Sequence, residues 1–460
     1  MLPLTLSQIA EVTGGTVHDA SPDQTVTGNV VFDSRAVQPG DLFAAFVGAH
    51  DDGHRFVPDA MAAGAVGVLA SRPVFAPAVV VPDVGDALTT LAGWSARRMN
   101  GTVKIGITGS SGKTSTKDLV AQVLDRQGPT TATIGSRNNE LGVPVTVLSA
   151  TEDTRYLVLE MGARGIGHLA HLTSIVALDA AVVLNVGTAH AGEFGSKEAT
   201  AQAKGELVEA LTPAGTAVLN ADDPLVAQMA SRTEATIVWF GRSPAAHVRA
   251  ENVKLDSDGR ASFLLVTPSG SAPVSLQLFG EHHVHNALAA AALAYAQGMP
   301  ADAVASALSM AHATSAGRMQ RHDLPDGSTI IDDSYNANPD SMRAGLQALA
   351  AMRGSRRTIA VLGEMAELGI TASQEHHAVG ALAGQLGVDV VVAVGQDAAA
   401  RTADGAEAAG VVVHRVADAQ AASDLLIDLL RAGDVVLVKG SRSAGLQAVV
   451  HHVVQVAASA

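Results

Sequence analysis

One short segment near residue 110 constrains the fold of this chain more than any other. A β-rich run, Val103–Thr108, leads into a loop of glycine and serine, and an apolar-periodic stretch, Thr114–Leu124, follows directly. This order predicts a buried strand, a tight loop and a helix, which together begin an α/β unit. Further apolar runs continue the pattern at 156–159, 180–184, 216–219 and 237–240. We therefore predict a doubly wound, mainly parallel sheet in the middle of the chain.

Composition excludes several classes of protein. The 30 Lys and Arg against 45 Asp and Glu give a formal net charge of -15, which argues against a broad nucleic-acid-binding surface. The chain has no Cys, so any metal would be held by oxygen or imidazole, and disulfides and thiol nucleophiles are excluded. Neither a signal peptide nor an apolar run of about 18 residues is found. We expect a soluble, cytoplasmic protein with no membrane span.

The loop after the first predicted strand has the chemistry of a phosphate site. Free backbone N–H groups at the start of a helix and the helix dipole attract phosphate. Lys113 adds a charge for the outer phosphates, and the Thr114 hydroxyl suits Mg²⁺. A strict P-loop would carry Gly at 107, which is Ile, so this is a shortened variant. An ordinary turn is the alternative, which the flanking strand and helix disfavour. The predicted nucleotide contacts are Gly109, Ser110, Ser111, Gly112, Lys113, Thr114 and Ser115.

The rest of the chain predicts two more α/β units around this central one. A length of 460 residues suggests about two to four domains. Short extended pieces precede the central unit, and strands alternate with helices again after Gly317. We predict a small N-terminal α/β domain over 1–97, a central P-loop domain over 98–315, and a C-terminal Rossmann-like α/β domain over 316–460.

The Thr-Gly-x-x-Gly-Lys-Thr variant resembles the loop of the Mur ligases and the folylpolyglutamate synthases, which use ATP to form an amide bond. The resemblance to Mur ligases covers nearly the whole chain, through 160–163, 185–187, 203–206, 332–339 and 439–442. The Tyr335–Pro339 motif is similar to that of the branch that joins D-alanyl-D-alanine to UDP-N-acetylmuramoyl-tripeptide. Leu184 and Glu364 depart mildly from the family pattern. The resemblance implies an ATP-dependent ligase of peptidoglycan precursor synthesis that works through an acyl phosphate.

The resemblance also implies roles for residues of the central domain. Asn286 would contact the adenine of ATP, and Lys113, Glu160, His190 and Lys204 would be catalytic. Thr114, Glu160, His190 and Lys204 would hold Mg²⁺, with Lys204 converted to a carbamate. Glu160 also follows a buried strand, at the sheet edge where α/β proteins bind ligands. Without the family context, Glu160 would be an exposed strand-end carboxylate, His190 a turn histidine, and Lys204 a solvated lysine paired with Glu198 or Glu209.

Substrate residues are implied on all three domains. Arg318 and Asp333 would reach across a cleft to ATP, so that domain closure completes the site. The dipeptide would lie among Asn336, Asn338, Lys439, Ser441 and Arg442. The N-terminal domain would bind the UDP-substrate through Ser34 and Arg35, and a central loop would contribute Asn138 and Asn139. We expect a monomer.

Several alternatives remain open. The loop alone would also suit a regulatory ATPase with no second substrate, or a folylpolyglutamate synthase. The histidines of Glu281–Asn286 could form a zinc site, although we favour Asn286 as a nucleotide contact. His376 lies near a family motif but is equally well interpreted as an exposed helix histidine. Nothing in the sequence decides whether the third peptide residue is Lys or diaminopimelate.

Overall fold

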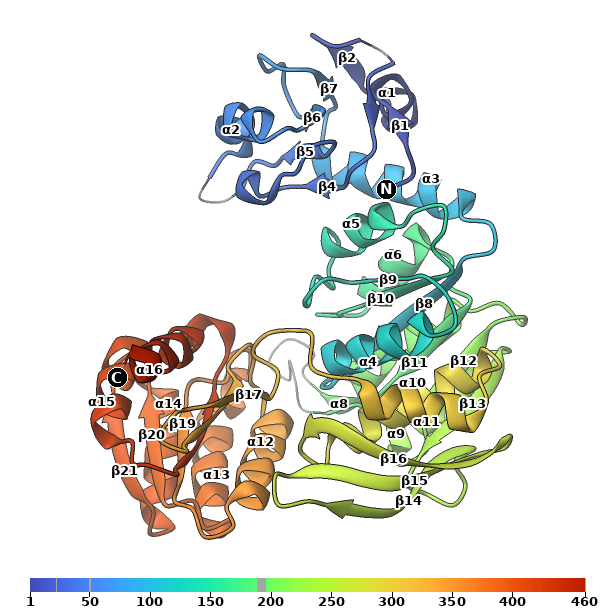
Figure 1. Ribbon diagram of the computed structural model, residues 1–460. Coiled ribbons are helices and arrows are strands. Elements are labelled where there is room, and N and C mark those ends of the chain that lie inside the picture. The colour runs from blue at the N-terminus through green and yellow to red at the C-terminus, as the bar shows by residue number, and fades with distance from the viewer. Residues whose placement is uncertain (22, 49–50, 188–195, 460) are drawn as a thin grey trace.

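Three main β-sheets follow one another along the chain in a computed structural model that describes residues 1–21, 23–48, 51–187 and 196–459. In Figure 1 the N-terminal sheet lies above the central sheet, and the C-terminal sheet lies beside the central one. The predicted α/β class, with three mainly parallel sheets, is confirmed. The domain boundaries near 97 and 315 stay a prediction. No helix in these described ranges is long and apolar enough to cross a membrane.

The N-terminal sheet is small and has the strand order β2-β7-β6-β5-β4, with only β2 and β7 antiparallel. Its strands are β2 (Thr16–His18), β4 (Val30–Val31), β5 (Leu42–Ala45), β6 (Gly67–Ala70) and β7 (Ala78–Val80). A separate pair joins β1 (Leu4–Thr5) to β3 (Thr25–Val26). The helices are α1 (Leu6–Thr13), α2 (Val57–Ala62) and α3 (Val84–Arg98), with 3₁₀ turns η1 (Ser34–Ala36) and η2 (Gly53–Phe56). Helix α1 begins at a capping box formed by Thr5 and Gln8.

The central sheet has nine strands in the order β16-β15-β14-β13-β12-β11-β8-β10-β9. Strands β8 to β14 run parallel, so the sheet is mainly parallel as predicted, although β9 and β14 were not among the predicted strands. The parallel strands are β8 (Val103–Thr108), β9 (Thr130–Ala132), β10 (Tyr156–Glu160), β11 (Ala180–Val183), β12 (Thr216–Asn220), β13 (Thr236–Gly241) and β14 (Val248–Leu255). Strands β15 (Arg260–Thr267) and β16 (Gly270–Phe279) add an antiparallel edge that the sequence analysis did not predict. The helices are α4 (Lys113–Asp125), α5 (Gly142–Ser149), α6 (His168–Ile175), α8 (Lys197–Glu209), α9 (Pro224–Gln228), α10 (His283–Ala296) and α11 (Ala301–Met310), with η3 (Met229–Arg232).

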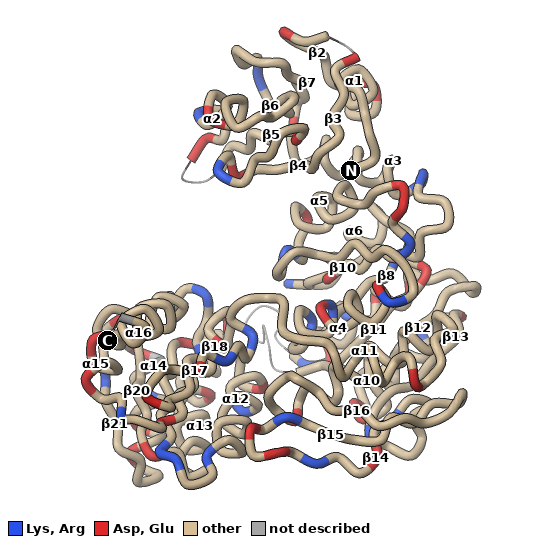
Figure 2. The backbone as a smooth tube through the Cα atoms, in the orientation of Figure 1, with Lys and Arg blue, Asp and Glu red and all other residues tan. Residues whose placement is uncertain are grey.

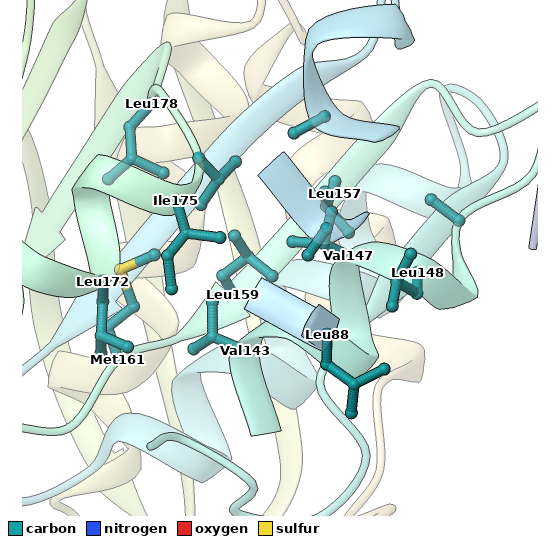
Figure 3. Packing of buried hydrophobic residues seen from close by; sticks show 14 of the residues in the cluster. Leu88, Val143, Val147, Leu148, Leu157, Leu159, Met161, Leu172, Ile175 and Leu178 are labelled. Atoms are coloured by element: carbon teal, nitrogen blue, oxygen red, sulfur yellow. The ribbon is translucent and has the colours of Figure 1, made fainter. Parts of the chain in front are cut away.

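A shared hydrophobic core connects the N-terminal region to the central sheet. Helix α3 packs against α5 and α6, and Leu88 of α3 belongs to one buried cluster with Val143 and Val147 of α5 and Leu157 of β10 (Figure 3). All four side chains are fully buried or nearly so. Burial of a leucine or valine stabilises a fold by about 1.5–3 kcal/mol. The N-terminal region is therefore joined to the edge of the central sheet by packing as well as by the chain.

The C-terminal sheet has six strands in the order β17-β18-β22-β19-β20-β21, with only β17 and β18 antiparallel. The strands are β17 (Gln320–Asp323), β18 (Thr329–Asp333), β19 (Thr358–Leu362), β20 (Val390–Val394), β21 (Val412–Val416) and β22 (Val435–Lys439). The helices are α12 (Pro339–Met352), α13 (Ala372–Gln385), α14 (Ala398–Ala408), α15 (Ala419–Leu429) and α16 (Gln447–Ser459), with η4 (Gly369–Thr371) and η5 (Arg442–Ala444).

Strand register brings polar residues together at two sheet edges. Glu160 ends β10 beside Ile107 of β8, immediately before the phosphate loop. Asp333 ends β18 beside Lys439, which ends β22. The carboxyl ends of parallel strands meet at one edge, where α/β folds bind ligands. Figure 2 shows acidic and basic residues interspersed along all three regions, which agrees with charge being used locally.

Candidate active site

One large cavity, of about 1200 Å³, lies between the central and C-terminal sheets. It brings together residues that the sequence analysis selected from distant segments. Those that line it are Ser110, Ser111, Gly112, Lys113, Thr114, Ser115, Asn138, Asn139, Glu160, Asn286, Arg318, Asp333, Asn336, Asn338, Lys439, Ser441 and Arg442. His190 lies outside the described residues. Gly109, Lys204, Ser34 and Arg35 do not line the cavity.

The phosphate loop is held in shape by main-chain geometry and one asparagine. Gly112 has φ +80°, and a Cβ at this position would lie 2.6 Å from Asn286 Oδ1. Asn185 Oδ1 accepts hydrogen bonds from the N–H groups of Ser110 and Ser111, each at 3.0 Å. Lys113 Nζ donates to Gly109 O at 2.7 Å. Asn185 is part of the 185–187 motif, but its role as the anchor of the loop was not predicted from the sequence.

Glu160 is a buried carboxylate with one oxygen satisfied and one not. Its Oε1 accepts hydrogen bonds from Ser136 Oγ at 2.8 Å and from Asn138 Nδ2 at 2.7 Å. Its Oε2 is buried and has no hydrogen-bond partner among the described residues. An unpaired buried carboxylate oxygen is costly unless a cation or donor meets it. This oxygen therefore fits a divalent cation, which prefers such hard ligands.

Lys204 lies on α8 and is only 2% exposed. Burial lowers the pKa of its amine far below the usual value, and the charge of Lys113 lowers it further. No hydrogen bond or ion pair joins Lys204 to Glu198 or Glu209, and Glu209 pairs with Arg232 at 2.8 Å instead. The interpretation of Lys204 as a solvated, paired lysine is therefore wrong. Burial also lowers the pKa of Lys113, although Glu160 and Glu367 oppose that shift.

The C-terminal wall of the cavity contains a buried ion pair. Lys439 Nζ lies 2.5 Å from Asp333 Oδ2 and also donates to Asn336 O at 3.0 Å. The other oxygen, Asp333 Oδ1, accepts a hydrogen bond from Met319 N at 3.3 Å. Burial lowers the pKa of Lys439, and the Asp333 charge opposes this shift. Asp333 and Lys439, which were assigned to different substrates from the sequence, thus act as one electrostatic unit.

Two contacts cross from the C-terminal wall to the phosphate loop. Arg318 Nη2 donates to Thr114 Oγ1 at 3.3 Å, and Asn338 Nδ2 reaches Ser110 O at 3.5 Å. The Arg318 guanidinium also stacks on the Tyr335 ring, 4.4 Å from its centroid. Asn338 forms the N-terminal capping box of α12 together with Ser341. The two walls are therefore already in contact around the loop.

His376 is not an exposed helix histidine, because it is fully buried. Its Nδ1–H donates to Ala372 O at 2.7 Å, and its Nε2 accepts from Met365 N at 2.9 Å. Burial lowers the pKa of this imidazole, which agrees with a neutral ring. The next residue, Ala366, donates its N–H to Ser441 Oγ at 2.8 Å. His376 and Ser441 thus fix the loop that follows β19 at the edge of the cavity.

The histidines around residue 283 do not converge on one point. No group of at least three metal-ligating side chains is found among the described residues. His285 Nε2 instead lies 3.1 Å from Asp222 Oδ2, and His283 Nδ1 lies 3.3 Å from Asn286 Nδ2. Burial is the main cause that lowers the pKa of His282 to about 4. Asn286 faces the phosphate loop through this arrangement.

The predicted residues of the N-terminal region stand apart from the cavity. Ser34 and Arg35 lie on η1, where Arg35 pairs with Asp33 at 2.8 Å and is 88% exposed. Hydrogen bonds from Arg35 are the main cause that lowers the pKa of Asp33 to about 2. Arg137 of the central region contacts the N-terminal region, since its guanidinium lies 5.1 Å from the centroid of the Phe32 ring.

Family models match three segments of the chain. The Mur ligase middle domain matches 107–294, the Mur ligase glutamate ligase domain matches 317–442, and the Mur ligase catalytic-domain model matches 27–89.

Curated relatives and solved structures agree with these matches. The UDP-N-acetylmuramoyl-tripeptide–D-alanyl-D-alanine ligase of Mycobacterium tuberculosis is 49% identical, over 98% of this chain and 97% of the relative. The Escherichia coli enzyme of that name is 39% identical over 98% of both chains. A crystal structure of MurF from Acinetobacter baumannii gives a TM-score of 0.86 at 34% identity, over 98% of this chain and 99% of that one. MurF from Thermotoga maritima in complex with ADP gives 0.78 at 28% identity, over 94% and 99%. This chain belongs to the Mur ligase family.

Proposed function

We propose that this chain is an ATP-dependent ligase that joins D-alanyl-D-alanine to UDP-N-acetylmuramoyl-tripeptide in peptidoglycan precursor synthesis. The observation that carries the proposal is that one cavity unites the Lys113 phosphate loop, Glu160 with an oxygen that lacks a partner among the described residues, and the loop residues 335–338. The curated relatives named for this reaction support the choice of substrates.

The proposed reaction has two steps. The terminal carboxylate of the tripeptide attacks the γ-phosphate of ATP, which forms an acyl phosphate and releases ADP. The amine of the dipeptide then attacks the acyl carbon, and inorganic phosphate leaves with the electrons of the broken C–O bond. Both steps concentrate negative charge on oxygen, so preorganised positive groups supply most of the catalysis. Lys113 is the cation placed for the transferring phosphoryl group.

Mg²⁺ is proposed as the metal of this site, held by Thr114, Glu160, His190 and Lys204. The buried Glu160 Oε2, which lacks a partner among the described residues, supports this assignment. When bound, the ion neutralises charge on the phosphates. A Lys204 ammonium would repel it, whereas a carbamate would be a ligand. The lowered pKa of Lys204 favours the neutral amine, which is the form that combines with CO₂.

The remaining residues are proposed for substrate binding. Asn286, Arg318 and Asp333 would contact ATP together with the loop from Gly109 to Ser115. Asn138 and Asn139 would meet the muramyl peptide, with Ser34 and Arg35 further along the UDP-substrate. The dipeptide carboxylate would lie near Arg442 and Ser441, with Asn336, Asn338 and Lys439 around it, because guanidinium and hydroxyl donors suit a carboxylate. We further propose action as a monomer in the cytoplasm, where ATP is available.

ADP release across a panel of acceptors tests the proposal. The panel pairs UDP-muramyl dipeptide and tripeptides ending in Lys or diaminopimelate with D-alanyl-D-alanine, L-alanyl-L-alanine and single amino acids. We expect one ADP per ligated product, with a tripeptide and D-alanyl-D-alanine both required. ADP release without any amine would instead indicate a regulatory ATPase, and ligation of glutamate to a folate would indicate a folylpolyglutamate synthase.

A further inference from the structure

The segment that joins the central and C-terminal sheets lies along the helix that follows the phosphate loop. Gln122 Nε2 donates to His312 O at 2.9 Å, and His312 N donates back to Gln122 Oε1 at 3.1 Å. One turn earlier on α4, Asp118 Oδ2 accepts from Ser315 N at 3.1 Å. A further turn earlier, Thr114 Oγ1 accepts from Arg318 Nη2 at 3.3 Å. Successive residues of the connecting segment 312–318 therefore contact successively earlier turns of α4.

These three helix residues share one face because they are spaced by four. Residues four apart on a helix are neighbours on its surface, and eight residues span about 12 Å. We call Thr114, Asp118 and Gln122 the α4 track. The track meets the connecting segment at both of its ends and in its middle, so the segment is docked on α4 over its whole length.

Asp118 is itself fixed in place. Its Oδ1 pairs with Lys117, and both side chains are buried. A buried ion pair with its remaining oxygen used by a main-chain N–H is a rigid acceptor, because neither charge can be released without a large penalty. The middle of the connecting segment is therefore held by the least mobile part of the track.

The residues on either side of Arg318 are tied to the C-terminal wall. Gly317 has φ +66° and Met319 has φ +53°, both in the left-handed region, so the chain turns sharply here. Tyr335 N donates to Gly317 O at 3.2 Å, and Met319 N donates to Asp333 Oδ1 at 3.3 Å. Because Arg318 also stacks on the Tyr335 ring, it is held between the α4 track and the loop that follows β18.

We infer that the α4 track, through Asp118 and Gln122, positions Arg318 against Thr114 before any substrate binds. Arg318 then stands at the phosphate loop as part of the nucleotide site, whether or not the other two substrates are present. Asp118 and Gln122 are positioning residues that act through Arg318. This inference rests on the nucleotide site proposed above, and it revises the expectation that Arg318 reaches ATP only on closure.

Binding of a non-hydrolysable ATP analogue in the absence of both other substrates tests the inference on the full-length chain. Calorimetry compares the wild type with Arg318→Ala, Gln122→Ala and their double variant. We expect about tenfold weaker binding for Arg318→Ala, since a hydrogen bond from a charged group is lost. We expect about threefold weaker binding for Gln122→Ala. The loss from Gln122→Ala should vanish in the Arg318→Ala background, because Gln122 acts only through Arg318.

Gln127→Ala is the matched control, because Gln127 also donates to a main-chain carbonyl, that of Gln297, but does not contact the connecting segment. It should leave binding of the analogue unchanged. Gln122→Glu is the milder variant if Gln122→Ala fails to fold, since the side chain keeps its acceptor for His312 N and loses its donor. Equal losses for Gln122→Ala and Gln127→Ala would overturn the inference.

Two further results overturn it while leaving the proposed function intact. One is an unchanged affinity for the analogue in Arg318→Ala with a reduced kcat, which would mean that Arg318 arrives on closure. The other is full additivity of Gln122→Ala and Arg318→Ala. A Lys113→Ala variant distinguishes failure of this inference from failure of the proposed function. Near-normal ligation by a folded Lys113→Ala protein would remove the nucleotide site itself, and both proposals with it.

Discussion

Both walls of the cavity carry charged groups, but the two walls differ in whether their buried charges are paired. On the central wall, Glu160 keeps one buried oxygen without a partner among the described residues. The same domain holds Lys204, a buried amine on α8 outside the cavity lining, whose pKa is lowered. On the C-terminal wall, Lys439 and Asp333 neutralise each other at 2.5 Å. Uncompensated buried charge is expensive, so it is retained where a ligand will meet it. The difference indicates that the central wall binds the metal, whereas the Lys439–Asp333 pair of the C-terminal wall is already neutralised and needs no ligand.

The largest effect is expected for Lys113→Ala on the central wall. Loss of the cation placed for the transferring phosphoryl group should lower kcat by about a thousandfold, since such groups act mainly in the transition state. Steady-state ADP release measures the change, and circular dichroism checks that the variant is folded. Ligation at a near-normal rate by a folded Lys113→Ala protein would contradict the contrast between the walls, because the central wall would then supply no cation that catalysis needs.

Glu160→Gln should have the next largest effect, with kcat lowered by about a hundredfold and at least tenfold more Mg²⁺ needed for half-maximal rate. The amide keeps the shape of the side chain but cannot serve as an anionic ligand. Mg²⁺ titrations of ADP release provide the measurement. Glu140→Gln is the control, because Glu140 lines the same cavity but is exposed. Equal Mg²⁺ requirements in the two variants would contradict the metal assignment of Glu160.

Lys204→Met should reduce activity by about tenfold or more and yet raise the melting temperature in bicarbonate-free buffer. A buried amine without a described partner destabilises the fold, and the thioether removes that penalty. The pKa of Lys204 is lowered in the folded state, so the unfolded chain binds the proton more strongly. The stability of the wild type should therefore rise with pH up to the ordinary lysine value, and the advantage of Lys204→Met should shrink accordingly.

Scanning calorimetry at pH 7 and pH 9.5 measures this trend. A melting temperature of Lys204→Met below that of the wild type at pH 7 would show that the amine is compensated after all.

The smallest effect on kcat is expected for Lys439→Met, which acts on stability instead. Removal of one member of a buried pair should cost about 3–5 kcal/mol, because Asp333 is left as an uncompensated charge. The double variant Lys439→Met with Asp333→Asn should recover much of that loss. Urea denaturation at pH 7 compares the three proteins. Equal stability of Lys439→Met and the wild type would show that the C-terminal wall does not depend on its ion pair.

The sequence predicted several strands that form continuous apolar runs, and β8 was predicted with its observed bounds, Val103–Thr108. The antiparallel strands β15 and β16 were missed for different reasons. Strand β16 mostly alternates buried and exposed residues and has no long apolar run, whereas β15 contains the apolar run 263–266, which was overlooked. The order of strands in the C-terminal sheet could not be predicted either. Asp333 and Lys439 are far apart in sequence, and only the pairing of β18 with β22 makes them neighbours.

The site residues, like the strands, were predictable where the signal is local in the sequence and not where it depends on tertiary contacts. The loop and Glu160 were found because local sequence places them at strand ends, and the structure puts them in one cavity. The burial of Lys204 and His376 could not be predicted, since α8 and α13 carry many polar residues and the contacts that cover them are tertiary. Ser34 and Arg35 were chosen by resemblance, and they lie on an exposed turn away from the cavity.

A crystal structure of this chain with Mg²⁺ and a non-hydrolysable ATP analogue tests the contrast between the walls most directly. The account predicts that Mg²⁺ lies at coordination distance from Glu160 Oε2 and that Lys113 Nζ leaves Gly109 O for a phosphate oxygen. It also predicts that the Lys439–Asp333 pair is unchanged. A metal bound elsewhere, with Lys113 still on Gly109 O and the Lys439–Asp333 pair broken to receive the ligand, would contradict it.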